Sequence, residues 1–186
     1  MPTIFTHSVA GIACGSAFYK RSLHRGGMLF SAICSVIPDF DVISFKLGMP
    51  YSSFWGHRGF FHSISFACIL GTFTGILLMI AGKRKWKGGL FYAAYFSFVM
   101  SLHGLLDAFT NGGMGVALLS PFINERYFFP FRPIEVSPIS VQAFLDGRGF
   151  QVLQNEMVWV WLPSICMALF FRIFISVKNR LSLIQR

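Results

Sequence analysis

The stretch FFHSISFACILGTFTGILLMIAG, residues 60–82, decides the class of fold. It holds no aspartate, glutamate, lysine or arginine. A helix needs about 20 consecutive apolar residues to cross the hydrocarbon core of a bilayer. This segment has that length, so we predict that it forms a transmembrane helix.

The composition of the rest of the chain agrees with a membrane protein. The 186 residues are 54% hydrophobic and 17% aromatic, and only 12% are charged, whereas a soluble domain carries about 25% charged residues. The length suits a single domain. The four cysteines fall in separate apolar segments, which is typical of small buried side chains rather than of disulfides or metal ligands.

Four more apolar segments are candidates for helices. Residues 89–109 and 157–176 are apolar, residues 28–47 are interrupted by PDFD, and residues 3–19 are short and rich in small residues that favour close helix packing. Residues 111–156 are too polar and too rich in proline to span, so we expect an external interfacial loop that covers the site. The fold class is therefore predicted to be an all-α integral membrane bundle of about five helices, forming one domain over residues 1–186.

The lysines and arginines predict how this bundle is oriented in the membrane. Basic residues are enriched in cytoplasmic loops, and three clusters lie on one side if the N-terminus is outside and the C-terminus inside. These clusters account for the net charge of +9 without a nucleic-acid partner, and they suit anionic lipid head groups. Their members are Lys20, Arg21 and Arg25, the stretch KRKWK at residues 83–87, and Arg172, Lys178, Arg180 and Arg186.

The stretch MSLHGLLDAF, residues 100–109, puts a histidine and a carboxylate inside an apolar segment. Four residues separate His103 from Asp107, so the two share one face of a helix. An ionised aspartate at the bilayer centre costs about 2.5–3.5 kcal/mol, so a polar partner is expected. The predicted topology gathers His7, Asp39, Asp41, His57, His62, His103 and Asp107 at the external ends of four helices, and only His24 falls on the cytoplasmic side.

Histidines and aspartates that converge from several helices predict a metal site. Neutral imidazole and carboxylate are usual ligands of zinc, and such a set can hold two ions. We expect one or two divalent ions, zinc being favoured. The expected ligands are His7, Asp39, His62, His103 and Asp107, with His57 and Asp41 either ligating the metal or hydrogen-bonded to a ligand.

The same residues predict metal-assisted hydrolysis. Asp39 or Asp41 could orient a water molecule or take its proton. Arg58 and Arg132 fall on the external side and could bind a substrate phosphate, whereas Arg126 is expected to be peripheral.

The motifs resemble those of a known family. His7, PDFD at residues 38–41, HRGFFHS at residues 57–63 and HGLLD at residues 103–107 are similar to the pattern of the YdjM-like family, described as membrane-bound metal-dependent hydrolases. The order of these residues also resembles, more distantly, zinc-dependent phospholipase C and the P1-type nucleases, which hydrolyse phosphate esters. The chain has no histidine after His103, so the third zinc of those enzymes is not expected here.

The resemblance implies a hydrolase that acts on a phosphate ester of a lipid or lipid-linked substrate at the external membrane surface. Two alternatives stay open at this point, a non-catalytic metal-binding membrane protein and a small transporter. Which of His57 and His62 ligates the metal, and the oligomeric state, are also open.

Overall fold

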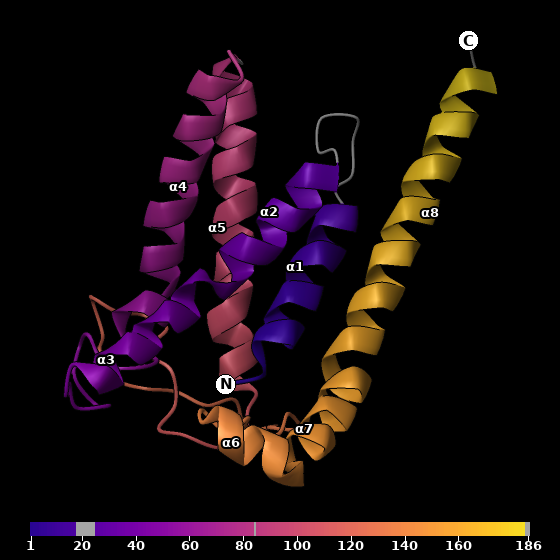
Figure 1. Cartoon of the computed structure of the whole chain (residues 1–186). Coiled ribbons are helices and arrows are strands. Elements are labelled where there is room, and N and C mark those ends of the chain that lie inside the picture. The colour runs from indigo at the N-terminus through magenta and orange to yellow at the C-terminus, as the bar shows by residue number, and fades with distance from the viewer. Residues whose placement is uncertain (18–24, 84, 185–186) are drawn as a thin grey trace.

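The structure is a computed structural model that describes residues 1–17, 25–83 and 85–184. Lys20, Arg21 and His24, which the topology prediction places on the cytoplasmic side, lie outside these residues. Within the described ranges the regular elements are helices, together with two isolated β-bridges. Figure 1 shows the long helices running side by side, with the irregular segments gathered at one end. The predicted all-α bundle is confirmed.

Within the described residues, five main helices build the bundle. In the same part of the chain four segments are long and apolar enough to cross a membrane, while the first helix is shorter; the four are Gly27–Lys46, Ile64–Ala81, Trp86–Ala108 and Val141–Lys178. The main helices are α1 (Ile4–Ala17), α2 (Arg25–Val36), α4 (Ile64–Ala81), α5 (Trp86–Ala108) and α8 (Leu162–Ile184).

Pairs of glycines four residues apart bring consecutive helices into close contact. A Cβ atom added at Gly71 would lie 2.3 Å from the backbone nitrogen of Ser97, so α4 and α5 pack backbone against backbone. A Cβ atom at Gly11 would lie 2.7 Å from the carbonyl oxygen of Ser31, which gives α1 and α2 the same kind of contact. Small residues at this spacing are a common basis for helix association in membranes. The fold therefore contains two tight helical hairpins.

The buried core lies where these hairpins meet. Phe96, Val99 and Met100 of α5 are each about 1% exposed and pack with Cys34 of α2 and Ala67 of α4. The apolar core holds the polar ends of both hairpins in fixed positions.

The second predicted helix ends sooner than expected. Residues 37–42 form a 3-10 helix, η1 (Ile37–Val42), followed by the short helix α3 (Ile43–Lys46). Pro38 lies at the start of η1 and has no backbone N–H to donate, so the α-helical hydrogen-bond pattern cannot continue through it.

The predicted external loop, residues 111–156, is helical in its last third. Three elements, α6 (Val141–Ala143), η3 (Phe144–Arg148) and α7 (Gly149–Glu156), lead through the π-helix η4 (Met157–Trp161) into α8. The segment is therefore irregular up to residue 140 and helical from Val141, while its external position stays a prediction. Gly147 has a φ of +101°, which kinks this helical run and lets it turn under the bundle.

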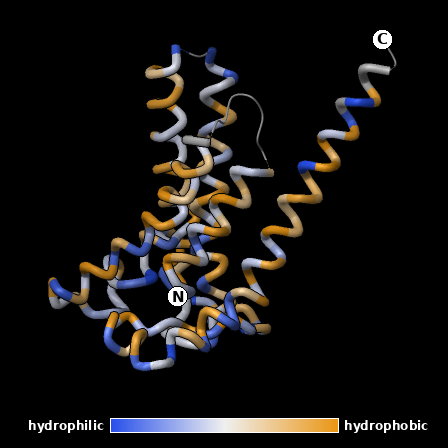
Figure 2. The backbone as a smooth tube through the Cα atoms, turned by 45° about the vertical axis from the view of Figure 1, so that its right-hand side comes forward, coloured by the Kyte–Doolittle hydropathy of each residue, from blue (hydrophilic) through white to orange (hydrophobic). Residues whose placement is uncertain are grey.

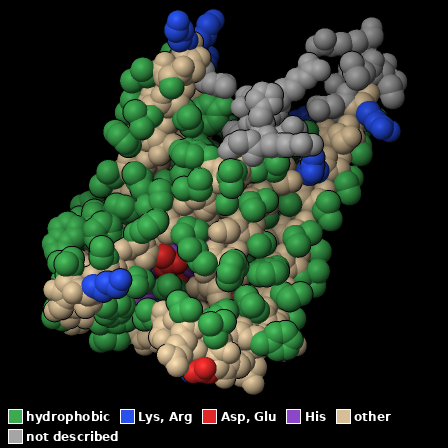
Figure 3. All heavy atoms as spheres, in the orientation of Figure 1, with side chains coloured by type: hydrophobic (Ala, Val, Ile, Leu, Met, Phe, Trp, Pro, Cys, Tyr) green, Lys and Arg blue, Asp and Glu red, His purple; other side chains and the backbone are tan. Residues whose placement is uncertain are grey.

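Charge and hydropathy are distributed along the long axis of the bundle. Figure 2 shows apolar residues along most of each long helix and hydrophilic ones at the α4–α5 connection and toward the C-terminus. Figure 3 shows lysine and arginine side chains at these same two places. This arrangement agrees with the predicted clustering of basic residues, while the orientation of the chain in the membrane stays a prediction.

Candidate metal centre

The structure brings all seven predicted site residues into one buried cluster. His7 lies in the first turns of α1, Asp39 and Asp41 on η1, and His103 and Asp107 near the end of α5. His57 lies in the loop after α3, and His62 ends the 3-10 helix η2 (Phe60–His62) just before α4. The most exposed member is Asp39 at 8%. The predicted convergence is therefore observed, while metal binding itself stays a prediction.

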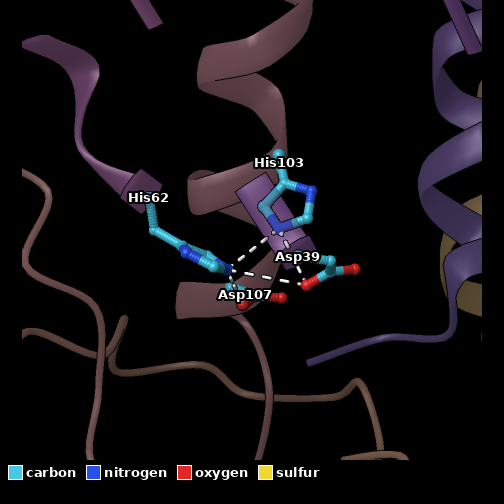
Figure 4. A group of neighbouring side chains, drawn as sticks. All are labelled: Asp39, His62, His103 and Asp107. Atoms are coloured by element: carbon cyan, nitrogen blue, oxygen red, sulfur yellow. Dashed lines mark hydrogen bonds and ion pairs between the residues drawn. The ribbon is translucent and has the colours of Figure 1, made fainter. Parts of the chain in front are cut away.

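Four of the seven residues point at one spot. Asp39, His62, His103 and Asp107 each offer one atom, and these atoms all lie within 4.8 Å of one another. Figure 4 shows the four side chains meeting from η1, from η2 and from two positions on α5. The Nε2 atoms of His62 and His103 are 3.0 Å apart, and Asp39 Oδ1 lies 3.3 Å from His103 Nε2 and 3.7 Å from His62 Nε2. Asp107 Oδ2 lies 3.3 Å from His62 Nε2.

These separations suit a tetrahedral metal ion. Zinc bonds to nitrogen and oxygen are about 2.0–2.2 Å long, so ligand atoms at the corners of a tetrahedron lie about 3.3–3.6 Å apart. Four of the six separations, 3.0 to 3.7 Å, bracket that range, and the other two lie within 4.8 Å.

A hydrogen bond at its outer nitrogen assigns the tautomer of His103. His103 Nδ1 lies 2.7 Å from the carbonyl oxygen of Ser35, which can only accept, so Nδ1 carries the hydrogen. His62 Nδ1 lies 2.9 Å from Asp41 Oδ2, but the geometry is not that of a hydrogen bond. When the hydrogen of the neutral His62 ring is on the side of Asp41, both Nε2 atoms present lone pairs toward each other and toward two carboxylates. Such a group binds a cation, either a proton between the two nitrogens, which are 3.0 Å apart, or a metal ion.

Asp41 fixes the orientation of both neighbouring histidines. Its Oδ1 lies 2.6 Å from His57 Nδ1, and its Oδ2 accepts from the backbone N–H of Arg58 at 3.0 Å. A carboxylate that holds the outer nitrogen of a ligating histidine is the usual support of a metal site. Asp41, His57 and His62 also form a second group close enough to share an ion, so the choice between ligand and supporting residue stays open for His57.

Burial lowers the pKa values of the histidines, and neighbouring carboxylates raise them. Burial lowers the pKa of His57 more than its contact with Asp41 raises it. Burial also lowers the pKa of His62, but Asp41, Asp107 and Asp39 surround it and hold its pKa well above the usual value. His62 therefore takes up a proton readily, and a metal ion would have to displace that proton.

His7 adjoins the four-atom group without belonging to it. Its ring stacks on His103 with centroids 3.7 Å apart and planes inclined by 18°. Its Nε2 lies 3.5 Å from Asp107 Oδ1, and neither of its ring nitrogens has a hydrogen-bond partner in the part of the chain that the structure describes. His7 is thus placed either to contact the expected ligand Asp107 from outside the four-atom group or to bind a second metal ion.

Arg58 is buried, whereas the prediction that it binds a substrate phosphate requires an accessible side chain. It is fully buried, its Nε lies 3.0 Å from Asp107 Oδ2, and its guanidinium donates to the carbonyl oxygen of Gly112 and to Thr110 Oγ1. A side chain in this position supplies the counter-charge of Asp107 rather than an open contact for phosphate.

The two other arginines also take definite places. Arg132 is exposed, with its guanidinium carbon 4.9 Å from the centre of the Phe128 ring. Arg126 is half-buried and donates to the carbonyl oxygens of Tyr51, Ser53 and His57. Arg126 therefore holds the loop that carries His57, a structural role that its sequence context did not indicate.

Glu156 is a buried carboxylate that sequence reasoning missed. It is 0% exposed and accepts hydrogen bonds from the backbone N–H and hydroxyl of Thr3 and from the hydroxyl of Thr6, which in turn accepts from Trp161 Nε1. The available signal was an acid directly before an apolar run. These bonds tie the end of α7, and through Trp161 the end of η4, to Thr3 and to Thr6 in the first turn of α1, one residue before His7.

Comparisons with known proteins bear on the same residues. A family model described as the YdjM inner membrane protein matches residues 1–181, a range that includes the whole cluster. The chain is also 36% identical over 165 residues to the inner membrane protein YbcI of Escherichia coli (strain K12), which covers 88% of this chain and 93% of that protein. No solved structure matches the chain. The family resemblance of the motifs is therefore confirmed, and the chain belongs to the YdjM family of multi-pass inner membrane proteins.

Proposed function

We propose that this protein is a membrane-bound, metal-dependent hydrolase that cleaves a phosphate ester of a lipid or lipid-linked substrate at the external face of the inner membrane. The observation that carries the proposal is the meeting of four electron-pair donors, from Asp39, His62, His103 and Asp107, at one buried point. A cation is the partner that such a group lacks.

The charges of the cluster support a divalent ion. Asp39, Asp41 and Asp107 contribute three negative charges and Arg58 one positive charge, which leaves a formal charge of −2 when the histidines are neutral. One divalent cation balances that charge and removes much of the cost of burying the carboxylates. Imidazole and carboxylate together suit zinc. A bound ion of this kind would supply Lewis-acid activation of water and of a phosphoryl oxygen.

The residues around that point have different roles in the proposed reaction. Asp39 is the most exposed of the four residues at 8%, but both of its oxygens are buried and lack a hydrogen-bond partner among the described residues. We assign to this carboxylate the role of orienting a water molecule or accepting its proton. The carbonyl of Ser35 holds His103 in the ligating tautomer, and Asp41 Oδ2 lies 2.9 Å from the outer nitrogen of His62.

A second function has its own support in the geometry. Four protein donors fill a tetrahedron, and closed four-ligand sites are typical of structural metals, whereas catalytic zinc keeps a position open. The burial of all seven residues points the same way. The alternative is a non-catalytic metal-binding membrane protein in which the ion joins the helices.

Metal content and turnover, measured on the same purified protein, separate these functions. The chain in detergent is analysed for bound metal and then assayed on a panel of lipid phosphates before chelation, after chelation, and after zinc is restored. His103→Ala is the test variant. His24→Ala is the matched control, because it removes the single histidine that the topology prediction places away from the cluster.

We expect about one or two metal ions per chain, turnover that chelation removes and zinc restores, and loss of both metal and turnover in His103→Ala alone. A chain without bound metal would overturn the metal site. Stoichiometric metal with no restorable turnover on the panel would favour the non-catalytic function.

A further inference from the structure

An apolar groove runs along the seam between α1, α5 and α8, beside the metal centre. Its volume is about 330 Å³, within the range of about 300–1,000 Å³ typical of small-molecule sites. It is lined by Ala10, Ala13, Cys14 and Ala17 of α1, by Phe98, Leu102 and Leu106 of α5, and by Ser164, Met167, Ala168 and Phe171 of α8.

The groove exists because one wall has short side chains. Ala10, Ala13 and Ala17 face it from α1, while the opposite walls carry larger apolar residues. Figure 1 shows α8 leaning away from the other helices toward its C-terminal end, so the walls do not close on each other. Space that larger residues on α1 would fill is therefore left open.

The groove opens toward the bilayer. Both α5 and α8 belong to segments that can cross a membrane. Three lining side chains, Phe98, Met167 and Phe171, are 41–57% exposed. The medium around them is hydrocarbon, so a lipid chain can enter from the side without crossing water.

One end of the groove adjoins the metal centre. Leu102 and Leu106 directly precede His103 and Asp107 on α5, and Ala10 lies one helical turn beyond His7 on α1. From Phe98 to Leu106 the groove follows about 12 Å of helix. Half of the hydrocarbon core is about 15 Å thick, so the groove covers most of one leaflet. A chain lying here, with its polar end toward Leu106, has its head group at the depth of the His/Asp cluster.

We propose that this groove binds a long acyl or isoprenoid chain of a lipid phosphate and so positions the phosphate ester at the metal centre. The inference deepens the proposed hydrolase function and rests on it for the role of the phosphate. It makes the substrate a single long-chain lipid held from the side of the bilayer, in contrast to a phosphate ester captured from the aqueous phase.

Photolabelling tests the groove without requiring turnover. The full chain is placed in vesicles of phosphatidylethanolamine and phosphatidylglycerol that contain a trace of phosphatidic acid with a diazirine on its palmitoyl chain. Labelled peptides are mapped by mass spectrometry, with and without excess unlabelled phosphatidic acid. Ala13→Phe and Met167→Trp fill the groove from opposite walls, and Ala94→Phe, at an exposed position on α5 outside the lining, is the control.

We expect labelling of residues 10–17 and 98–106 that unlabelled lipid competes away. Each groove-filling variant should lower that competed labelling by about tenfold or more, while metal content stays that of the parent and Ala94→Phe behaves as the parent. Labelling that does not saturate, or that persists in both groove-filling variants, would overturn the proposal that the groove binds a lipid chain.

A turnover measurement distinguishes this inference from the hydrolase itself. If the enzyme is active, Ala13→Phe should slow hydrolysis of a long-chain lipid phosphate and spare a short-chain, water-soluble ester. Equal slowing of both would overturn the positioning role. Saturable labelling with no turnover of either substrate would support the groove as a lipid-binding site and would contradict the proposed hydrolase activity.

Discussion

Replacement of Glu156 by glutamine tests whether a buried carboxylate fixes the first turn of α1. The wild-type carboxylate accepts three hydrogen bonds from Thr3 and Thr6. The amide keeps one accepting oxygen and turns an NH2 group, which can only donate, toward the remaining donors. One or two bonds are therefore lost. A hydrogen bond to a charged group contributes about 1.5–3 kcal/mol, and interhelical bonds in membranes are often weaker, near 0.6 kcal/mol.

We take about 1–3 kcal/mol as the cost, because the network is fully buried but lies at the end of the bundle. For a chain of this length each kcal/mol lowers the unfolding temperature by about 2–4 °C, so Glu156→Gln should lower it by roughly 2–12 °C. The change should also weaken zinc binding, since His7 follows Thr6 directly.

The assay is thermal unfolding in detergent, followed by circular dichroism, with a zinc titration of the same samples. Glu125→Gln is the matched control, because Glu125 is exposed and accepts a hydrogen bond from the hydroxyl of Tyr127 at the surface. An unfolding temperature for Glu156→Gln within about one degree of the control would refute the reasoning. It would mean that apolar packing, and not this network, holds α1 against the end of α7.

Three further predictions concern the cluster and the topology. Arg58→Ala removes the buried counter-charge of Asp107 and should cost about 3–5 kcal/mol, seen as a lower unfolding temperature even in the absence of substrate; unchanged stability would return Arg58 to a role in substrate binding. Because the pKa of His62 is raised, zinc must displace its proton, so the dissociation constant should rise by about tenfold for each unit that pH falls below that pKa; a titration series that is flat with pH would contradict this. Reporter fusions at Lys85 and at the C-terminus should be cytoplasmic and one at Gly147 external, and an external reading at Lys85 would invert the topology.

The sequence was sufficient for the fold class and for the membership of the cluster. Long apolar runs predict spans because helices satisfy their own backbone in lipid, and polar residues in such runs need partners, which is why His103 and Asp107 stood out. The helical segment from Val141 to Glu156 was missed because its residues are polar and follow several prolines.

The details of the site could not be predicted in the same way. The partner of His103 Nδ1 is the backbone carbonyl of Ser35, and a backbone group leaves no mark in the sequence. The burial of Arg58 depends on the position of the loop around Gly112, whose carbonyl it meets. Such contacts follow from how distant segments pack, which spacing along the chain does not encode.

The two glycine-packed hairpins have a consequence for how the protein matures in the cell. The first hairpin, α1 with α2, leads directly into Asp39 and Asp41, whose recorded partners are His57, Arg58, His62 and His103. Every one of these partners is synthesised later, and His103 only with the second hairpin. In a nascent chain the partners of Asp41 are complete once His62 is made, whereas Asp39 lacks His103 until α5 is made. Metal capture would then be the last step of biogenesis, joining two helical hairpins that inserted separately.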